Sequence, residues 1–243
     1  MNSDIDIGCS GFYNRLWKGI FYPEGVPGRL WFEYYCQHFS TFEMNGTFYK
    51  APTARGLKGW HDRAPDDFSF SVKAPRWVTH TRRFRECADD IAKFYEIVRE
   101  GLAGKLGHVL FQMPPSFHFS EERLEQAVSS IDRSFSNVIE FRHISWWRPD
   151  VYQALADNNI AFCSVNYPNL PTNIINTNGL VYVRFHGTPK LFYSQYTEDE
   201  LAFTRDEILA SGCNKAVVYF NNTASEAGIL NAMEMKRLIL IDY

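Results

Sequence analysis

Two glutamates and one histidine are the strongest candidates for acid–base chemistry in this sequence. Glu43, Glu140 and His186 each lie at or next to the end of a short apolar run. A carboxylate can accept a proton from water or a hydroxyl group, and histidine can serve as a base, an acid or a metal ligand. We therefore take these three as the catalytic candidates, with Glu140 as the first choice and His186 as the second.

A larger set of residues could bind an anionic ligand. Arginine offers a forked donor that matches phosphate or carboxylate, lysine offers a point charge, and amide side chains hydrogen-bond to polar groups. The expected ligand-binding residues are Ser10, Asn45, Lys73, His80, Gln112, Arg142, Trp146, Arg184, Asn221 and Asn222. Trp146 is included because, with Trp147, it is the best candidate for stacking on a ring of the ligand.

Several of these residues also have a structural interpretation. Alternate residues of a strand share a face, so Glu140 would lie beside Arg142. Burying Glu140 or Arg184 without a partner would cost several kcal/mol, so an ion-pair network is the alternative to a ligand site. Similarly, the basic stretch Arg76–Arg85 could follow a phosphate backbone or form the solvated start of a helix.

Short apolar runs position these side chains, and most of the runs stop at a polar or charged residue. Eight of them recur: Asp4–Ser10, Thr41–Asn45, Phe68–Lys73, Gly107–Gln112, Asn137–Arg142, Ile160–Asn166, Leu180–His186 and Ala216–Asn222. Helix-like stretches such as Thr53–Arg63 and Glu86–Glu100 separate most of the runs, and this alternation implies parallel βαβ units. Eight such units predict a single (β/α)8 TIM barrel with its active site at the carboxyl ends of the strands.

Local signals indicate where some helices begin and where one is missing. Thr197–Glu200 and Thr223–Glu226 both fit the capping-box pattern, and Ser120 is placed as a helix N-cap. Residues Tyr167–Asn178 contain two prolines and four asparagines. An irregular connection is therefore expected after the sixth strand, and long loops at a barrel rim are often functional.

Length and composition limit the architecture. The chain has 243 residues, which matches the roughly 250 of one such barrel, so we expect a single domain over residues 1–243. The net charge of −3 excludes a strongly basic nucleic-acid surface for the chain as a whole, although a local basic patch is compatible with it.

Cellular location is predicted from the same composition. No apolar run approaches the roughly 18 residues of a membrane span, and the first residues show no signal region. The five cysteines are widely spaced and form no CxxC pair. These features favour a cytoplasmic protein with reduced thiols and no membrane partner.

Nine sequence motifs occur in an order that is similar to one known family. They are Gly8–Gly11, Trp17–Pro23, Glu43–Tyr49, Val72–Lys73 with Thr79–His80, Leu106–Gly107, Gln112–Phe117, Glu140–Arg142 with Ser145–Trp146, Tyr182–Gly187 and Tyr219–Asn222. Together they cover nearly the whole chain and resemble the YecE-like family, TIM-barrel proteins described as a domain of unknown function. The resemblance implies the barrel and a rim site but supplies no activity. Members of the family are similar in shape to divalent-metal endonucleases that repair abasic DNA, and this similarity is an analogy of fold alone.

The favoured hypothesis is a hydrolase or related enzyme that acts at a cation-rich rim on an anionic, phosphate-bearing substrate, either nucleic acid or a small metabolite. A binding protein for a small anionic ligand is an alternative, so whether the chain is an enzyme stays open. A glycoside hydrolase is another, and it needs two carboxyl groups about 5–5.5 Å or 6.5–9.5 Å apart. Glu43, Glu140 and His186 could together hold a divalent metal, but no His/Asp cluster supports this, and no metal ligand is assigned.

Overall fold

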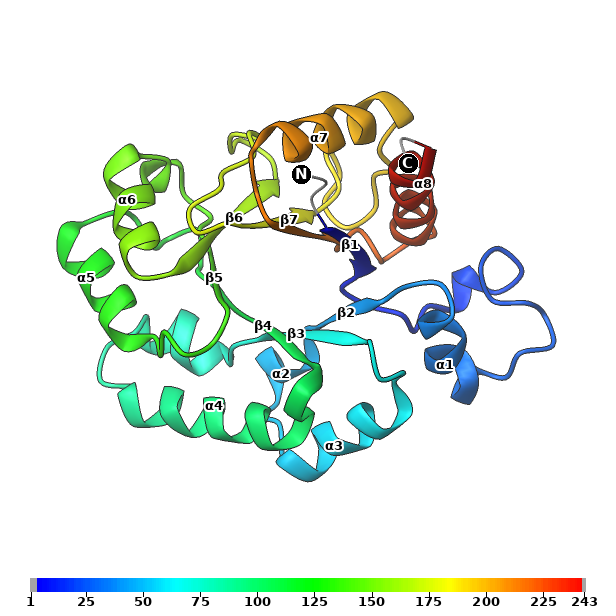
Figure 1. Ribbon diagram of the computed structural model, residues 1–243, viewed down its shortest axis with the longest axis horizontal. Helices are drawn as coiled ribbons and strands as arrows, with labels where there is room; N and C mark the ends of the chain where they lie inside the picture. Colours follow the sequence, from blue (N-terminus) through cyan, green and yellow to red (C-terminus); the bar gives the residue numbers. More distant parts are fainter. Residues whose placement is uncertain (1–3, 242–243) are drawn as a thin grey trace. The chain divides into compact units, whose positions relative to one another are not determined.

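The computed structural model describes residues 4–241, and its strands form one closed barrel in sequence order (Figure 1). The strands are β1 Asp4–Cys9, β2 Thr41–Met44, β3 Ser69–Lys73, β4 Leu106–Gln112, β5 Asn137–Glu140, β6 Ile160–Asn166, β7 Leu180–Phe185 and β8 Lys215–Phe220. The prediction of an eight-stranded parallel TIM barrel is confirmed.

Helices follow most of the strands. They are α1 Trp31–Cys36, α2 Gly46–Tyr49, α3 Ala54–Arg63, α4 Ala88–Leu102, α5 Glu121–Ser130, α6 Pro149–Asp157, α7 Glu198–Ala210 and α8 Ala227–Ile241. The segment between β6 and β7 is irregular, as its prolines and asparagines predict, and a π-helical turn, η3, spans Trp77–Arg82.

Contacts within the chain divide the described residues into two compact units. The first unit runs up to Glu43 and resumes at Ser164, and the second unit is Met44–Cys163. The expectation of one domain over residues 1–243 stays a prediction.

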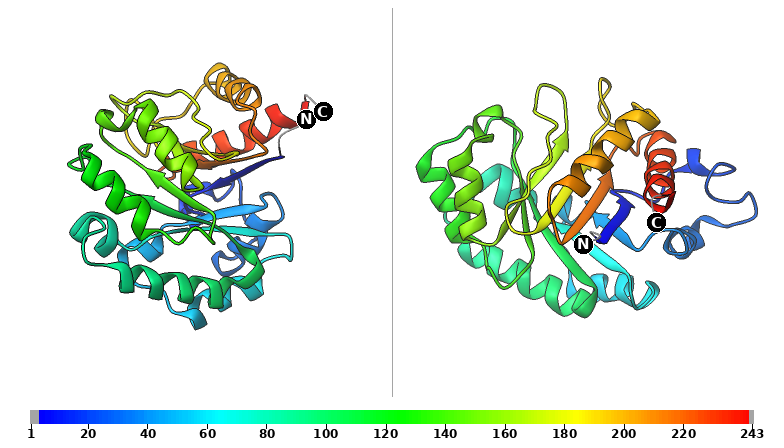
Figure 2. Two further views of the ribbon diagram at one scale, coloured as in Figure 1. Left: turned by 60° about the vertical axis from the view of Figure 1, so that its left-hand side comes forward. Right: turned by 45° about the horizontal axis from the view of Figure 1, so that its top comes forward.

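In the first unit, β8 pairs with both β1 and β7, and β1 pairs with β2, all in parallel register. Helix α8 packs on β1 and β8 and lies beside α7 (red and orange in Figures 1 and 2). Strand β7 is buried along its whole length, and its sequence is accordingly apolar except for the site candidate Arg184 and the hydroxyl of Tyr182. The Tyr35 hydroxyl accepts a hydrogen bond from the Cys9 amide (2.8 Å) and donates one to the Thr41 carbonyl (2.9 Å), which ties β1 to β2.

In the second unit, β4 pairs in parallel with β3 and β5, and β5 pairs with the first part of β6. Helices α3 and α4 pack side by side at the bottom of Figure 1. The core is aromatic, and the Tyr95 ring stacks on Phe135 at 4.2 Å while its hydroxyl donates to Asn137 Oδ1 (2.5 Å). A hydroxyl placed in this way lets a tyrosine be buried without losing its hydrogen bond.

Two of the three predicted helix caps, at Ser120 and Thr197, are confirmed. Ser120 caps α5 by accepting from the Arg123 amide, and Thr197 forms a complete capping box with Glu200. The second predicted capping box is wrong, because α8 begins at Ala227 and Thr223 lies in the turn before it.

Strand ends differ slightly from the prediction. Five strands stop one or two residues before the expected polar residue, because the chain already turns into the connecting loop there. The differences of two residues are at β8, which ends at Phe220 rather than Asn222, and at β5, which ends at Glu140 rather than Arg142. Arg142 therefore meets Glu140 from the loop and not through alternation along a strand.

Candidate functional site

The first unit contains a buried carboxylate with a complete set of donors. Ser10 follows β1, Glu43 lies in β2, and Tyr182 and Arg184 lie in β7. Glu43 Oε1 accepts from Ser10 Oγ (2.6 Å) and from Arg184 Nη2 (2.6 Å) and Nε (3.1 Å), and Oε2 accepts from the Tyr182 hydroxyl (2.7 Å). We call these four residues the Glu43 cluster.

Burial makes this arrangement strong and rigid. The side chains of Glu43 and Arg184 are 0% and 1% exposed. In such surroundings both charges need partners, and here each supplies the other while hydroxyl groups complete the coordination of the carboxylate. The cluster therefore orients Glu43 firmly, and the guanidinium of Arg184 faces a carboxylate of the protein itself.

His186 lies just beyond β7 in the same unit and is fully buried. Its Nδ1 is 2.9 Å from the Asn221 amide nitrogen, which donates to it, and its ring meets Tyr167 edge to face at 5.6 Å. The His186 backbone amide donates to the Asn166 carbonyl (3.1 Å). With Nδ1 accepting, the neutral ring carries its proton on Nε2.

Asn222 follows Asn221 but has a different environment. Its amide nitrogen donates to the Ser194 carbonyl (2.9 Å) and to Asn231 Oδ1 (3.2 Å), and the Asn231 amide donates to the Tyr196 carbonyl (2.9 Å). These bonds join the loop before α7 to helix α8. The structure thus gives Asn222 an anchoring role, and its part in ligand binding stays a prediction.

The second unit brings a lysine and a histidine to one phenylalanine. Lys73 ends β3, and its Nζ lies 4.1 Å from the centre of the Phe48 ring. His80, in the π-helical turn, meets the same ring edge to face at 4.9 Å. Thr47 Oγ1 donates to the Lys73 carbonyl (2.6 Å), which joins α2 to β3 at this point.

The surroundings of His80 lower the pKa of its imidazole. Burial, and then the positive charges of Lys73, Arg76, Arg142 and Arg83, lower the pKa of His80 to about 4. The half-buried imidazole is therefore neutral at pH 7. We call these five residues the cationic cluster.

Glu140 and Arg142 form an ion pair next to this cluster. Glu140 is fully buried at the end of β5, and Arg142, 8% exposed, donates from Nε to Glu140 Oε1. Gln112, at the end of β4, donates from its amide to the neighbouring Met113 carbonyl (2.6 Å). The Met113 amide in turn donates to the Glu140 carbonyl (2.8 Å), so the ends of β4 and β5 are held together.

Two further candidates of the second unit have structural surroundings. Asn45 precedes α2 in its N-cap position without capping it through its side chain. Trp146 is fully buried, its ring stacks on Phe141 (3.9 Å) and on Phe117 (5.2 Å), and its Nε1 donates to the Phe117 carbonyl (2.6 Å). The indole is thus packed against protein rings, as in a core.

The comparisons with known proteins agree with this architecture. Residues 6–242 match the model of the family described as "Protein of unknown function DUF72". The chain belongs to the DUF72 family. The resemblance to YecE-like proteins seen in the sequence is confirmed.

Two curated relatives match this DUF72 chain, one over nearly its full length and one over about half. It is 25% identical to UPF0759 protein YunF of Bacillus subtilis over 98% of this chain and 96% of the relative. It is 30% identical to UPF0759 protein YecE of Escherichia coli over 46% of this chain and 41% of that protein.

Solved structures of the family have the same fold. A DUF72 protein of Thermotoga maritima superposes with a TM-score of 0.88 at 28% identity, covering 99% of this chain and 100% of the other. A DUF72 protein of Enterococcus faecalis superposes with a TM-score of 0.79 at 21% identity, covering 100% and 99%. The second likeness shows the fold alone.

Sequence reasoning missed the backbone that presents His80 in this DUF72 protein. After the π-helical turn, Arg83, Phe84 and Glu86 have φ values of 54°, 67° and 48°. Left-handed backbone at non-glycine residues is costly, and both it and π-helical turns concentrate at functional sites. The basic composition of this stretch was the only available signal, and it is equally compatible with a solvated helix.

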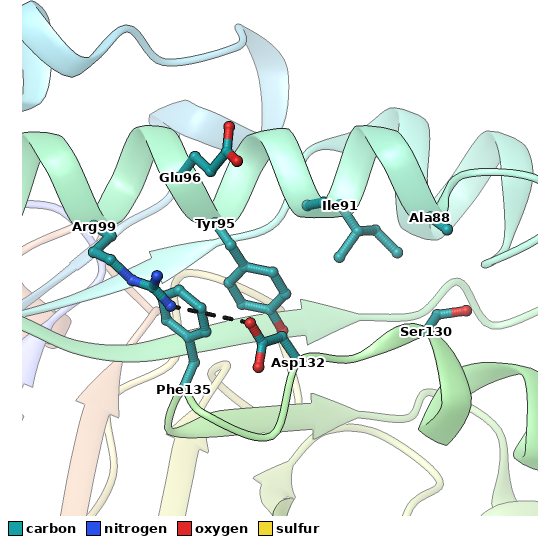
Figure 3. Close-up of a pocket in the computed structure, with 9 residues that line it drawn as sticks. Ala88, Ile91, Tyr95, Glu96, Arg99, Ser130, Asp132 and Phe135 are labelled. Atoms are coloured by element: carbon teal, nitrogen blue, oxygen red, sulfur yellow. Dashed lines mark ion pairs between the residues drawn. The ribbon is translucent and has the colours of Figure 1, made fainter.

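The second unit has a hollow that none of the predicted site residues lines. It measures about 200 Å³ and lies between α4 and the loop before β5, lined by Ile91, Tyr95, Phe135 and neighbours (Figure 3). Arg99 and Asp132 form an ion pair of 4.0 Å across it.

Within residues 4–241, no group of three or more His, Cys, Asp or Glu side chains could hold a metal ion. No helix in the described part of the chain is long and apolar enough to cross a membrane. All five cysteines are described and are free thiols, and Cys36 alone among them is not buried.

Proposed function

We propose that this DUF72 protein is a hydrolase or related enzyme whose phosphate-bearing, anionic substrate binds at the cationic cluster. One observation carries the proposal. Four positive side chains, those of Lys73, Arg76, Arg142 and Arg83, gather near the half-buried imidazole of His80, whose pKa is lowered to about 4 by burial and then by their charges. Positive charges gathered in this way would attract an oxyanion, and a bound oxyanion would relieve the repulsion among the cations.

Glu140 is the proposed base. Its pairing with Arg142 orients the carboxylate next to the cationic cluster. A carboxylate among cations is a poor acid but a serviceable base, so activation of water is the step we assign to it. Glu43 and His186 remain further catalytic candidates in the first unit.

A binding protein without turnover is the second candidate. The observation that favours it is that each candidate carboxylate is already paired with an arginine, Glu43 with Arg184 and Glu140 with Arg142. A carboxylate held by an arginine can shape a binding site as well as act as a base, so the pairing is also compatible with binding without turnover.

The anion site is tested by thermal unfolding with and without sulfate. We expect sulfate to raise the melting temperature through mass action, and Lys73→Gln to remove most of that rise. Loss of a charge-assisted hydrogen bond costs about 1.5–3 kcal/mol, so the affinity should fall about tenfold or more. Lys58→Gln, at an exposed lysine of α3 paired with Asp62, is the matched control and should keep the response. An undiminished sulfate response in Lys73→Gln would contradict the site.

The catalytic part needs a substrate screen. Phosphate monoesters, phosphodiesters including nucleic acids, and glycosides are offered to the parent and to Glu140→Gln. Lost turnover with retained sulfate binding supports Glu140 as the base, whereas full activity of Glu140→Gln excludes it. A parent that turns over none of these classes but binds sulfate would be a binding protein.

A further inference from the structure

His80 is held at the cationic cluster by more than one element. Its ring contacts Phe48 of α2, and its Nδ1 lies 3.0 Å from the hydroxyl of buried Thr79. The π-helical turn and the left-handed residues that follow it set the path of its backbone. These contacts engage the half-buried ring through Nδ1 and its edge, so Nε2 is the nitrogen through which it would meet a ligand.

The charges that face His80 come from three places. Lys73 belongs to β3, Arg142 follows β5 and is paired with Glu140, and Arg76 and Arg83 lie in the same segment as His80. Helix α2 contributes the uncharged Phe48 ring. Arg83 is held in place by a hydrogen bond from its Nη2 to Ser116 Oγ (2.9 Å).

We propose that His80 contacts the ligand and takes up a proton when a doubly charged oxyanion binds, so that the cluster prefers a terminal phosphate to a phosphodiester. This inference rests on the anion site proposed above and goes further by naming the charge state of the ligand and the residue that responds to it.

The physical reason is electrostatic linkage. In the free protein, burial and then the neighbouring cations oppose a positive charge on the imidazole, and together they lower its pKa to about 4. A dianion beside them cancels much of that field and raises the pKa, so a proton enters from the buffer and the new imidazolium donates to the ligand. Because linkage is reciprocal, the dianion must bind more tightly as the pH falls through the pKa of the complex. A monoanion brings half the charge and has a smaller effect.

The test is isothermal titration calorimetry in two buffers that differ in ionisation enthalpy. Sulfate serves as a dianion and dimethyl phosphate as a monoanion, since neither titrates between about pH 5.5 and about pH 7.5, the range around the ordinary histidine pKa. For the parent we expect sulfate binding with proton uptake near pH 6, and an affinity that rises severalfold from the upper to the lower pH. Dimethyl phosphate should bind more weakly and with less uptake.

Two variants locate the proton. His80→Gln keeps a hydrogen-bonding side chain but does not titrate, so it should bind sulfate with no uptake and with a nearly constant affinity across this range. His61→Gln removes a histidine of α3 that contacts Asp62, and it should behave as the parent.

The outcomes separate this inference from the proposed function. Absence of sulfate binding in the parent would overturn the anion site and this inference together. Sulfate binding that Lys73→Gln weakens, but without proton uptake or with uptake that persists in His80→Gln, would overturn only the role of His80. Equal affinity and equal uptake for dimethyl phosphate would overturn the preference for dianions.

Discussion

The Glu43 cluster and the cationic cluster use similar residues at strand ends but differ in how their charges are balanced. In the first unit, the buried Glu43 carboxylate accepts two hydrogen bonds from the Arg184 guanidinium and two from hydroxyl groups. In the second unit, Lys73, Arg142 and two further arginines act on a histidine that is only half buried.

This difference separates two uses of a buried charge. A carboxylate and a guanidinium that satisfy each other hold strands together and gain little from a ligand. Positive groups gathered around a neutral imidazole repel one another, and an added anion relieves that repulsion. This contrast supports the proposal that the ligand binds at the cationic cluster, whereas the bonding of the Glu43 cluster is that of a structural ion pair.

The largest expected effect breaks the Glu43 cluster. Arg184→Ala would leave a fully buried carboxylate without its cation, so the free energy of unfolding should fall by about 3–5 kcal/mol. Urea unfolding measures the change. Arg148→Ala, at an exposed arginine paired with Asp150, is the control and should lose less than about 1 kcal/mol. If Arg184→Ala also lost less than about 1 kcal/mol, the Glu43 cluster would not stabilise the fold more than an exposed ion pair does.

The next effect concerns sulfate affinity and distinguishes the two glutamates. Glu140→Gln removes the negative partner of Arg142, so sulfate should bind about threefold to tenfold more tightly, which corresponds to about 0.7–1.4 kcal/mol. Glu43→Gln removes a carboxylate whose partners belong to the first unit, and it should leave the affinity unchanged. Calorimetry on both variants provides the comparison, and equal responses would mean that the two clusters do not differ as described.

A smaller effect concerns pH and stability. Folding lowers the His80 pKa from its ordinary value of 6.5 to about 4, so between these values the unfolded chain binds a proton that the folded chain does not. The contribution of neutral His80 to stability is therefore present above about pH 6.5 and is lost as the pH falls toward 4. The parent should lose about 1 kcal/mol more than His80→Gln over this range, allowing for solvent screening of a partly exposed ring. Parallel pH profiles from urea unfolding would argue against a repelled imidazole.

The smallest effect compares one helix cap from each unit. Thr197→Ala removes a capping box at α7 and should lower the free energy of unfolding by about 1 kcal/mol. Thr53→Ala removes a single bond to the Gly56 amide at α3 and should cost about 0.5 kcal/mol. Thermal unfolding of both variants ranks them, and the reverse order would show that the packing of α3 outweighs its cap.

The strands and most helix caps were predictable because they depend on local patterns. Apolar runs with polar stops predicted all eight strands to within two residues, and Thr197 and Ser120 were identified from their own neighbours in the chain. The cap at Thr223 failed because the same pattern also fits a turn, and only the packing of α8 determines where that helix begins.

The candidate site was predictable by residue type but not by role. Trp146 could be recognised as an aromatic residue after a strand, yet the two rings that cover it come from residues 117 and 141. Phe48, the contact shared by Lys73 and His80, gave no signal of its own, since a phenylalanine in a short helix is ordinarily core. Whether both clusters meet at one rim stays a prediction.

The sequence by itself determined the parallel barrel and the polar residues at its strand ends, because hydrophobic periodicity and turn chemistry act over a few neighbouring residues. The tertiary structure decided which charges became partners. Glu43 and Arg184 are 141 positions apart, and their pairing depends on the pairing of strands. The low pKa of His80 likewise comes from burial and then from positive charges, of which Lys73 and Arg142 lie on other elements, and no local pattern in the chain encodes that combination.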